Sequence, residues 1–398
     1  MSELDLRVDG FLFGAVKAGI RGKDRLDLAL IYCTVPASAA AVFTTNQVKA
    51  APVLLGLERI KGGRVQAVLV NSGIANACTG EEGLARARGA SASAALALGI
   101  NEDLIQVSST GVIGQQLDMA CFDHLPRLVD GLKTEHAMEV ARAIMTTDTV
   151  PKTAVRTITI DGRPVKIVGM AKGSGMIQPN MATMLAYIMT DVAVTPTLLQ
   201  RILTKSVNQS FNRITVDGDT STNDTVLLLA SGQAGNHLID DPTSPEAALL
   251  QGAVDELSRD LALQIVADGE GATKLVTIMV EEARSDHEAE KAARTIANSP
   301  LVKTAFFGQD ANWGRIIAAL GRSGITFDQM AVDIAFDKAR IVGNGLWLGT
   351  EAEQTATKIL RQKSFTVHIN LHQGTGSCAI YTCDLSIDYV KINADYRS

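Results

Sequence analysis

Apolar residues recur along the chain in two spacings, one typical of strands and one typical of helices. Short continuous apolar runs bounded by Gly, Lys, Asn or Asp predict buried strands. These runs are Phe11–Ala18, Leu28–Val35, Ala39–Thr45, Val65–Val70, Leu104–Ser109, Ala154–Ile160, Val165–Gly169, Met184–Thr190, Val226–Ala230 and Leu275–Glu281. Helical spacing covers Glu81–Leu98, Phe122–Leu132, Glu135–Met145, Thr197–Ser210 and Glu246–Val266.

A second set of elements follows the strand at Leu275–Glu281. Ser285-Asp286 is typical of a helix cap, and a helix is expected over His287–Asn298. A further helix and three strands complete a small α+β unit, at Ile316–Leu320, Val332–Phe336, Phe365–Asn370 and Ser377–Thr382. We therefore expect a catalytic domain over 1–283 and a C-terminal α+β domain over 284–398.

The stretch Ala171–Asp191 stands out because it is rich in Gly, Pro and Asn and yet largely apolar. Loops of that composition are usually solvated, whereas the methionines and leucine here indicate burial. A buried irregular segment needs partners for its backbone polar groups. It holds one lysine, Lys172, and one threonine among small and apolar residues, Thr183. Two interpretations stay open, an active-site segment and a turn between core elements.

Composition excludes several classes of function. The net charge of −6 disfavours a nucleic-acid-binding protein and fits one with small-molecule substrates. The charged N-terminus is unlike a signal peptide, and the chain lacks an apolar run long enough for a membrane helix. Five cysteines without a C-x-x-C pair favour free thiols in a reducing cytoplasm. No metal site is expected, since His368 and His372 lie on a predicted strand, where four residues span roughly 13 Å.

Residues 172–185 read K-G-S-G-M-I-Q-P-N-M-A-T-M-L. This stretch resembles the signature of the ornithine acetyltransferase family, the glutamate N-acetyltransferases (ArgJ) of arginine biosynthesis. The resemblance implies self-cleavage between Ala182 and Thr183, which would give chains 1–182 and 183–398. Thr183 would then be an N-terminal nucleophile whose own amine, with a pKa near ~7.7–8.0, serves as the base. The same hydroxyl would first attack the Ala182 carbonyl.

Two more motifs carry the resemblance before this stretch. Thr110 and Gly111 end a predicted strand in S-T-G-V-I-G, where a hydroxyl and an N–H can meet at an oxyanion. The family places its oxyanion hole on the residues that match them. In the T-T-D-T motif the family uses a threonine to contact substrate. Thr146 is the first choice and Thr147 the second, and a helix end followed by a turn is the alternative.

The expected substrate-binding residues are Thr146, Lys172, Thr183, Glu270, Asn393 and Ser398. Lys172 is a cation for a substrate carboxylate, or else a lysine whose ammonium reaches solvent. Glu270 lies between two glycines in D-G-E-G-A-T-K, where the family has a glutamate for the substrate; a solvated turn is the alternative. The family also folds its C-terminus into the site, which by position implicates Asn393 and Ser398. The segment D-G-D-T-S-T-N-D at 217–224 is expected to form a buried hydrogen-bond network.

The resemblance extends through nearly the whole chain and implies an α+β fold of layered sheets flanked by helices, the ArgJ/DmpA-like fold. It implies transfer of acetyl from N2-acetyl-L-ornithine to L-glutamate in two ping-pong steps through acetyl-Thr183. No cofactor is expected, and acetyl-CoA is an open second donor. A cytoplasmic enzyme is expected in which the two self-derived chains stay together, as an α2β2 assembly. The alternatives are a self-cleaving aminopeptidase or amidase, and a non-enzymatic binding module.

Overall fold

The computed structural model describes residues 4–22, 24–178 and 184–395. It divides into two compact units, one formed by Met1–Asn212 with Asp219–Ile265 and one by Arg213–Gly218 with Val266–Tyr396. The second unit therefore begins before residue 284, the boundary expected from the sequence. The reason is β10 (Leu275–Ala283), which hydrogen-bonds to two strands of the second sheet.

The first unit is built on a mixed sheet in the order β4-β3-β2-β9-β7-β6-β5, with β1 also paired to β2. The pairs β3·β4 and β7·β9 are parallel and the other neighbours are antiparallel. The strands are β1 (Phe11–Val16), β2 (Leu28–Phe43), β3 (Arg64–Ile74), β4 (Ile105–Val112), β5 (Lys152–Ile160), β6 (Arg163–Lys172), β7 (Leu185–Thr190) and β9 (Thr225–Ala230).

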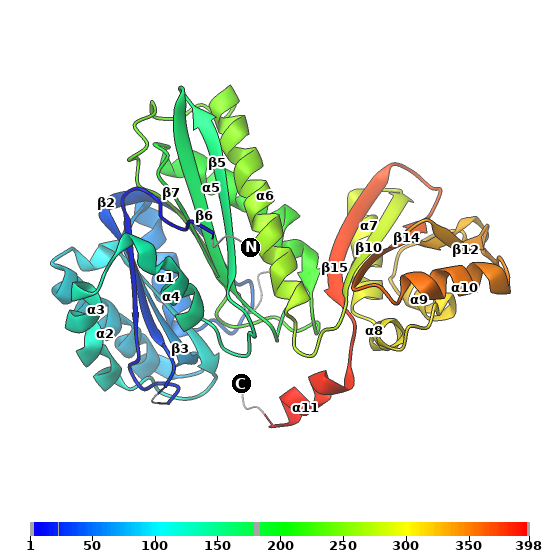
Figure 1. Cartoon of the computed structure of the whole chain (residues 1–398), viewed down its shortest axis with the longest axis horizontal. Helices are drawn as coiled ribbons and strands as arrows, with labels where there is room; N and C mark the ends of the chain where they lie inside the picture. The colour runs from blue at the N-terminus through cyan, green and yellow to red at the C-terminus, as the bar shows by residue number, and fades with distance from the viewer. Residues whose placement is uncertain (1–3, 23, 179–183, 396–398) are drawn as a thin grey trace. The chain divides into compact units, whose positions relative to one another are not determined.

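Helices cover both faces of this sheet (Figure 1). They are α1 (Ala51–Arg59), α2 (Gly80–Leu98), α3 (Leu125–Asp130), α4 (Ala137–Ala143), α5 (Pro196–Gln209) and α6 (Pro245–Ala267). Alternate residues of β2 separate the faces: Ala29 and Ile31 pack in one core with α4, and Leu28 and Leu30 in another with α1 and α2. The long helix α6 approaches β6 so closely that a Cβ on Gly169 would lie 2.6 Å from Leu257.

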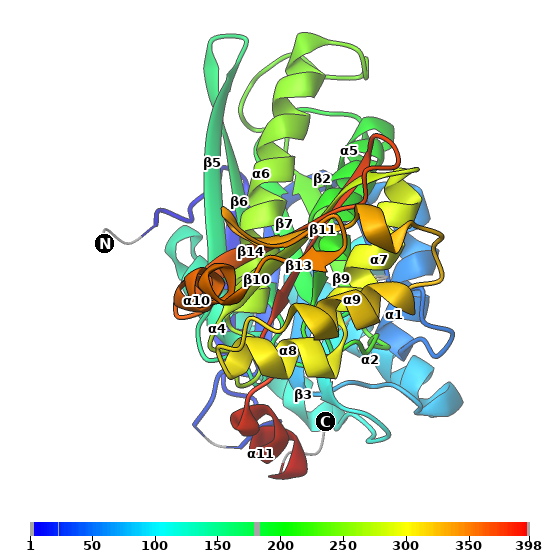
Figure 2. The same ribbon diagram turned by 90° about the vertical axis from the view of Figure 1, so that its right-hand side faces the viewer.

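The second unit has its own sheet, in the order β13-β12-β11-β14-β10-β15-β8. Its remaining strands are β8 (Ile214–Thr215), β11 (Asp333–Phe336), β12 (Ala339–Gly343), β13 (Leu346–Trp347), β14 (Ser364–Asn370) and β15 (Gly376–Cys383). Its helices are α7 (Asp286–Ala297), α8 (Pro300–Phe307), α9 (Trp313–Gly321), α10 (Thr350–Ile359) and α11 (Ile387–Asp395). Figure 2 shows α8 and α9 beside the strands of this sheet, and their apolar residues join one core with it.

The two sheets with flanking helices confirm the predicted α+β class. Two expected strands, Leu28–Val35 and Ala39–Thr45, are wrong as separate elements, because β2 runs through both with an irregularity between Tyr32 and Ala37. The expected helix over Phe122–Leu132 is shorter, since α3 begins at Leu125 with a proline in its first turn. The sequence analysis did not identify α1, α8, α10, α11, β8, β12 or β13.

Over the residues that the structure describes, no helix combines the length and apolar character required to cross a membrane. All five cysteines have free thiols. Within the same residues, no three His, Cys, Asp or Glu side chains are grouped so that they could hold a metal ion.

Candidate active site

Lys172 ends β6 and lies inside the first unit, with only 2% of its surface exposed. Its ammonium nitrogen donates to the hydroxyl of Thr146 at 2.7 Å and lies 3.5 Å from the hydroxyl of Thr110. Three residues predicted from separate motifs therefore meet at one buried cation. Lys172 does not reach solvent, which argues against the alternative interpretation of this lysine.

Asp148 supplies the counter-charge beneath this cluster. One carboxylate oxygen accepts hydrogen bonds from Lys152 and from the backbone of Gly173, both at 2.7 Å. The other accepts the backbone N–H of Thr146 at 2.9 Å and lies 3.9 Å from the Lys172 ammonium. Burial raises the pKa of the Asp148 carboxyl, but Lys172 and Lys152 lower this pKa by more than burial raises it. The resulting pKa is about 2.

The protonation of Lys172 is set by opposing effects. Burial lowers the pKa of its ammonium, and Asp148 acts against that shift. A buried lysine with a hydroxyl on one side and a carboxylate on the other is held at a fixed position. Such a group can bind a substrate carboxylate or stabilise negative charge that develops on a carbonyl oxygen.

Thr110 and Gly111 lie at the end of β4, where the strand pairs in parallel with β3. Gly111 has a φ of +132°, and a Cβ there would lie 2.2 Å from the carbonyl carbon of Gly73. Only glycine fits at this position, since the left-handed φ and the contact both exclude a side chain. The close approach of the paired strands β3 and β4 at Gly73 and Gly111 consequently fixes the backbone next to Thr110, whose hydroxyl lies beside Lys172.

The residue that contacts Lys172 is Thr146 and not Thr147. The sequence analysis missed a further side chain, Arg21, which binds the backbone carbonyl of Thr146. The guanidinium of Arg21 donates to the carbonyl of Thr146 at 2.8 Å and to the carbonyl of Met145. Asp27, which is fully buried, accepts the backbone N–H of Arg21 at 2.9 Å. The signal for this arrangement lay in K-A-G-I-R at 17–21, which composition alone did not distinguish from a common loop.

In the second unit, Glu270 and Asn393 contact one another. The Asn393 amide donates to the Glu270 carboxylate at 2.7 Å, and Glu270 is 8% exposed. The glycine after Glu270 allows this approach, because a Cβ on Gly271 would lie 2.5 Å from the backbone nitrogen of Tyr389 in α11. Glu270 is therefore held by α11 and is not a solvated turn residue.

Three predicted site residues, Ala182, Thr183 and Ser398, lie outside the described residues. Their roles stay predictions from the resemblance. In the segment that follows Lys172, the described residues end at Gln178 and resume at Met184.

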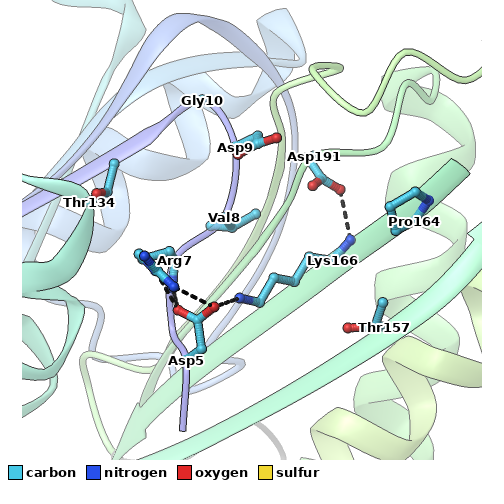
Figure 3. Close-up of a pocket in the computed structure, with 10 residues that line it drawn as sticks. All are labelled: Asp5, Arg7, Val8, Asp9, Gly10, Thr134, Thr157, Pro164, Lys166 and Asp191. Carbon is cyan, nitrogen blue, oxygen red and sulfur yellow. Dashed lines mark hydrogen bonds and ion pairs between the residues drawn. The ribbon is translucent and has the colours of Figure 1, made fainter.

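A cavity of about 430 Å³ lies elsewhere on the first unit (Figure 3). Lys166 donates from its ammonium to Asp5 at 2.8 Å and from its backbone to Asp191 at 2.9 Å. Burial raises the pKa of the Asp191 carboxyl. None of the predicted site residues that the structure describes lines this cavity.

Comparison with known proteins matches the chain to one family. The model of the ArgJ family covers residues 12–398. The protein named arginine biosynthesis bifunctional protein ArgJ from Desulfotalea psychrophila is 55% identical over 99% of this chain and all of its own length. The protein of the same name from Geobacter sulfurreducens is 52% identical over the same shares.

The chain belongs to the ArgJ family. A crystal structure of ArgJ from Bacillus halodurans is 44% identical, with a TM-score of 0.51, and it covers 53% of this chain and 98% of its own. Family membership confirms the resemblance, the ArgJ-like fold and the prediction of an acyltransferase of arginine biosynthesis. In this ArgJ-family chain the buried cluster around Lys172 is the candidate active site.

Proposed function

We propose that this ArgJ-family chain cleaves itself between Ala182 and Thr183 and then moves acetyl from N2-acetylornithine to glutamate through acetyl-Thr183. The observation that carries the proposal is the meeting of Thr110, Thr146 and Lys172 at one buried point. Lys172 is followed directly by the glycine-rich stretch that leads to Thr183. A cation, hydroxyl donors and a nucleophile on one segment are the parts that acyl transfer requires.

The roles follow from the chemistry of each group. Thr183 attacks the acetyl carbonyl while its own amine takes the proton and later returns it. Thr110 and the backbone of Gly111 stabilise the oxyanion, and Lys172 and Thr146 orient the substrate. Glu270 and Asn393, which contact one another in the second unit, are assigned the cationic end of ornithine, and the resemblance assigns Ser398 a substrate contact as well.

The length of the Bacillus halodurans chain supports cleavage. Almost all of that chain matches, yet it spans 53% of this one. Residues 183–398 number 398 − 182 = 216, or about 54% of the chain. A solved chain of that length is what a cleaved precursor provides.

The first experiment is the intact mass of the purified protein under denaturing conditions, with N-terminal sequencing. Two chains of 182 and 216 residues, the second beginning at Thr183, are expected, and a Thr183→Ala variant should remain a single chain of 398 residues. An uncut wild-type chain that transfers acetyl normally would overturn the proposed nucleophile.

The second experiment measures transfer. Ping-pong kinetics predict exchange of labelled ornithine into N2-acetylornithine when glutamate is absent. Release of acetate with no transfer to glutamate would instead identify a self-cleaving amidase. Acetyl-CoA offered as the donor in the same assay decides whether it is a second substrate.

The assembly is tested by light scattering of the cleaved protein. We propose an α2β2 assembly, for which the expected mass is twice 42.2 kDa. A mass of 42.2 kDa would show one pair of chains and contradict the proposal. Fractionation of the source cells tests the expected cytoplasmic location.

A further inference from the structure

The side chain of Arg21 lies against the end of β3, where β3 and β4 come close together. A Cβ on Gly73 would lie 2.5 Å from Cγ of Arg21. The same glycine meets β4, since a Cβ on Gly111 would lie 2.2 Å from the Gly73 carbonyl carbon. The aliphatic part of Arg21 therefore packs on the strand pair whose end carries Thr110, the expected oxyanion donor.

The guanidinium of Arg21 holds the backbone at Thr146. It donates to the carbonyl of Thr146 at 2.8 Å and to the carbonyl of Met145. A planar guanidinium that binds two successive carbonyls fixes the direction of the backbone between them. The hydroxyl of Thr146 in turn lies 2.7 Å from the Lys172 ammonium. The contact between Thr146 and Lys172 therefore depends on a backbone that Arg21 holds.

Arg21 is itself fixed by Asp27, which is fully buried. The two carboxylate oxygens of Asp27 accept the backbone N–H groups of Ala18 and Arg21, at 2.6 and 2.9 Å. The carbonyl of Asp27 accepts the N–H of Ser72 at 2.9 Å, and Ser72 directly precedes Gly73. Both the backbone and the side chain of Arg21 are thus tied to the end of β3.

Arg21 also adds positive charge to the candidate site. The charged groups that act on the Lys172 ammonium are the carboxyls of Asp148 and Asp224 and the cations of Lys152 and Arg21. Burial lowers the pKa of Lys172, the two cations lower it further, and the two carboxyls oppose that shift. Arg21 therefore acts on Lys172 through its charge as well as through its hydrogen bonds.

We propose that Arg21 is a positioning residue of the acetyl-transfer reaction. It holds Thr146, and through Thr146 the Lys172 ammonium, in a fixed position relative to the strand end that carries the oxyanion donors. The inference rests on the proposed function, because that function assigns the substrate to Thr146 and Lys172. It gives the segment K-A-G-I-R at 17–21 a role in aligning the substrate with the oxyanion hole, and that alignment has to hold within about 0.5 Å.

The test is Arg21→Met, with Arg21→Lys as the conservative variant. Methionine keeps an unbranched side chain against Gly73 but has neither the charge nor the N–H donors. We expect kcat/KM for N2-acetylornithine to fall about 10- to 100-fold, because misplacement near 1 Å can cost on the order of 100-fold. Lysine retains the charge and a donor for the carbonyls, so Arg21→Lys should recover most of the loss.

Arg86 provides the matched control. It is half-buried, as Arg21 is, and its guanidinium also donates to a distant backbone carbonyl, that of Leu117. Its other partner is Glu82, at 3.1 Å. None of these residues belongs to the predicted site, so Arg86→Met should keep the wild-type kcat/KM. Equal values of kcat/KM in Arg21→Met and Arg86→Met would overturn the proposal.

The pH profile separates positioning from a purely structural role. Lys172 has to be protonated to bind a substrate carboxylate, so its pKa sets a basic limb of kcat/KM. Removal of the Arg21 charge raises that pKa. The basic limb should therefore move to higher pH in Arg21→Met and stay in place in Arg21→Lys and Arg86→Met. A loss of kcat/KM with an unmoved basic limb would identify a purely structural role and overturn the proposal.

A further variant keeps the test decisive if Arg21→Met fails to fold. Arg21→Gln retains an NH2 donor for one carbonyl and lacks the charge, so the basic limb should move in the same direction with a smaller fall in kcat/KM. Self-cleavage should be unchanged in every Arg21 variant, because Thr146 is assigned to the substrate and not to the scissile bond. A folded Arg21 variant that remains uncut would overturn that assignment and the proposal with it.

Failure of the proposed function gives a different result. A wild-type protein that neither cuts itself nor transfers acetyl overturns both ideas together. Wild-type cleavage and transfer with indifferent Arg21 variants overturn only the positioning role.

Discussion

The ammonium of Lys172 lies 2.7 Å from the hydroxyl oxygen of Thr146, although the two residues come from different elements and are 26 positions apart. A neutral hydroxyl that accepts from a buried cation fixes the cation without cancelling its charge. Thr146→Val should lower kcat/KM for acetyl transfer by about 10- to 100-fold, since a hydrogen bond to a charged group is worth about 1.5–3 kcal/mol. Thr146→Ser retains the hydroxyl and should recover most of the loss. A fully active Thr146→Val enzyme would show that Lys172 does not depend on this contact.

Asp148 forms ion pairs with two buried lysines, Lys152 and Lys172, so its replacement should lower the thermal stability of the protein. Removing one partner of a buried ion pair costs about 3–5 kcal/mol. At neutral pH, Asp148→Asn should lower the melting temperature by several degrees, whereas Asp240→Asn, which changes an exposed carboxylate, should leave it unchanged. Equal melting temperatures for the two variants would contradict the role of the pair.

The same carboxylate gives a pH dependence with a definite sign. The pKa of Asp148 is lowered from 3.8 to about 2 in the folded protein. Its contribution is therefore complete above about pH 4 and is lost as the pH falls through about 2. The difference in melting temperature between wild type and Asp148→Asn should narrow over that interval. A difference that stays constant down to pH 2 would assign the stability to other groups.

Gly111 and Gly114 offer a matched pair. Both have a left-handed φ, but a Cβ on Gly111 would meet the Gly73 backbone at 2.2 Å, whereas Gly114 has nothing within 4 Å of that position. Gly114→Ala should cost only the strain of its φ, about 1–2 kcal/mol. In Gly111→Ala the end of β3 or β4 has to move to make room for the new Cβ. We expect this variant to show no measurable acetyl transfer and to melt at a lower temperature than Gly114→Ala. Similar activity in the two variants would argue against an oxyanion hole here.

Glu270→Gln removes a charge and retains an oxygen that can accept from Asn393. KM for N2-acetylornithine should rise about 10- to 100-fold while the melting temperature stays the same, because the loss is confined to a cationic substrate. Glu351→Gln, an exposed change in the same unit, should alter neither quantity. An unchanged KM in Glu270→Gln would remove this residue from the substrate site.

The sequence predicted most core elements because burial gives them a regular pattern. Alternation and apolar runs located the strands around Lys172, and glycine-rich motifs located Thr110 and Glu270. The sequence did not reveal α1, because this short helix begins at Ala51, with Pro52 in its first turn, inside a segment that resembles a loop. Nor did it reveal the contact of Arg21 with the Thr146 carbonyl, which joins residues 125 positions apart. Such a contact depends on tertiary packing, and the local segment K-A-G-I-R does not identify its partner.

The order of strands in the first sheet sets the kinetics of refolding. Strands β7 and β9 lie between β6 and β2, so cutting the chain between 182 and 183 leaves strands of the second product hydrogen-bonded on both sides to strands of the first. An uncut chain can rebuild this sheet in a unimolecular reaction. The cut protein has to rebuild it from two molecules, so its yield after denaturation would depend on protein concentration. Two samples with the same sequence would therefore differ in how well they refold, depending on whether the chain had been cut before denaturation.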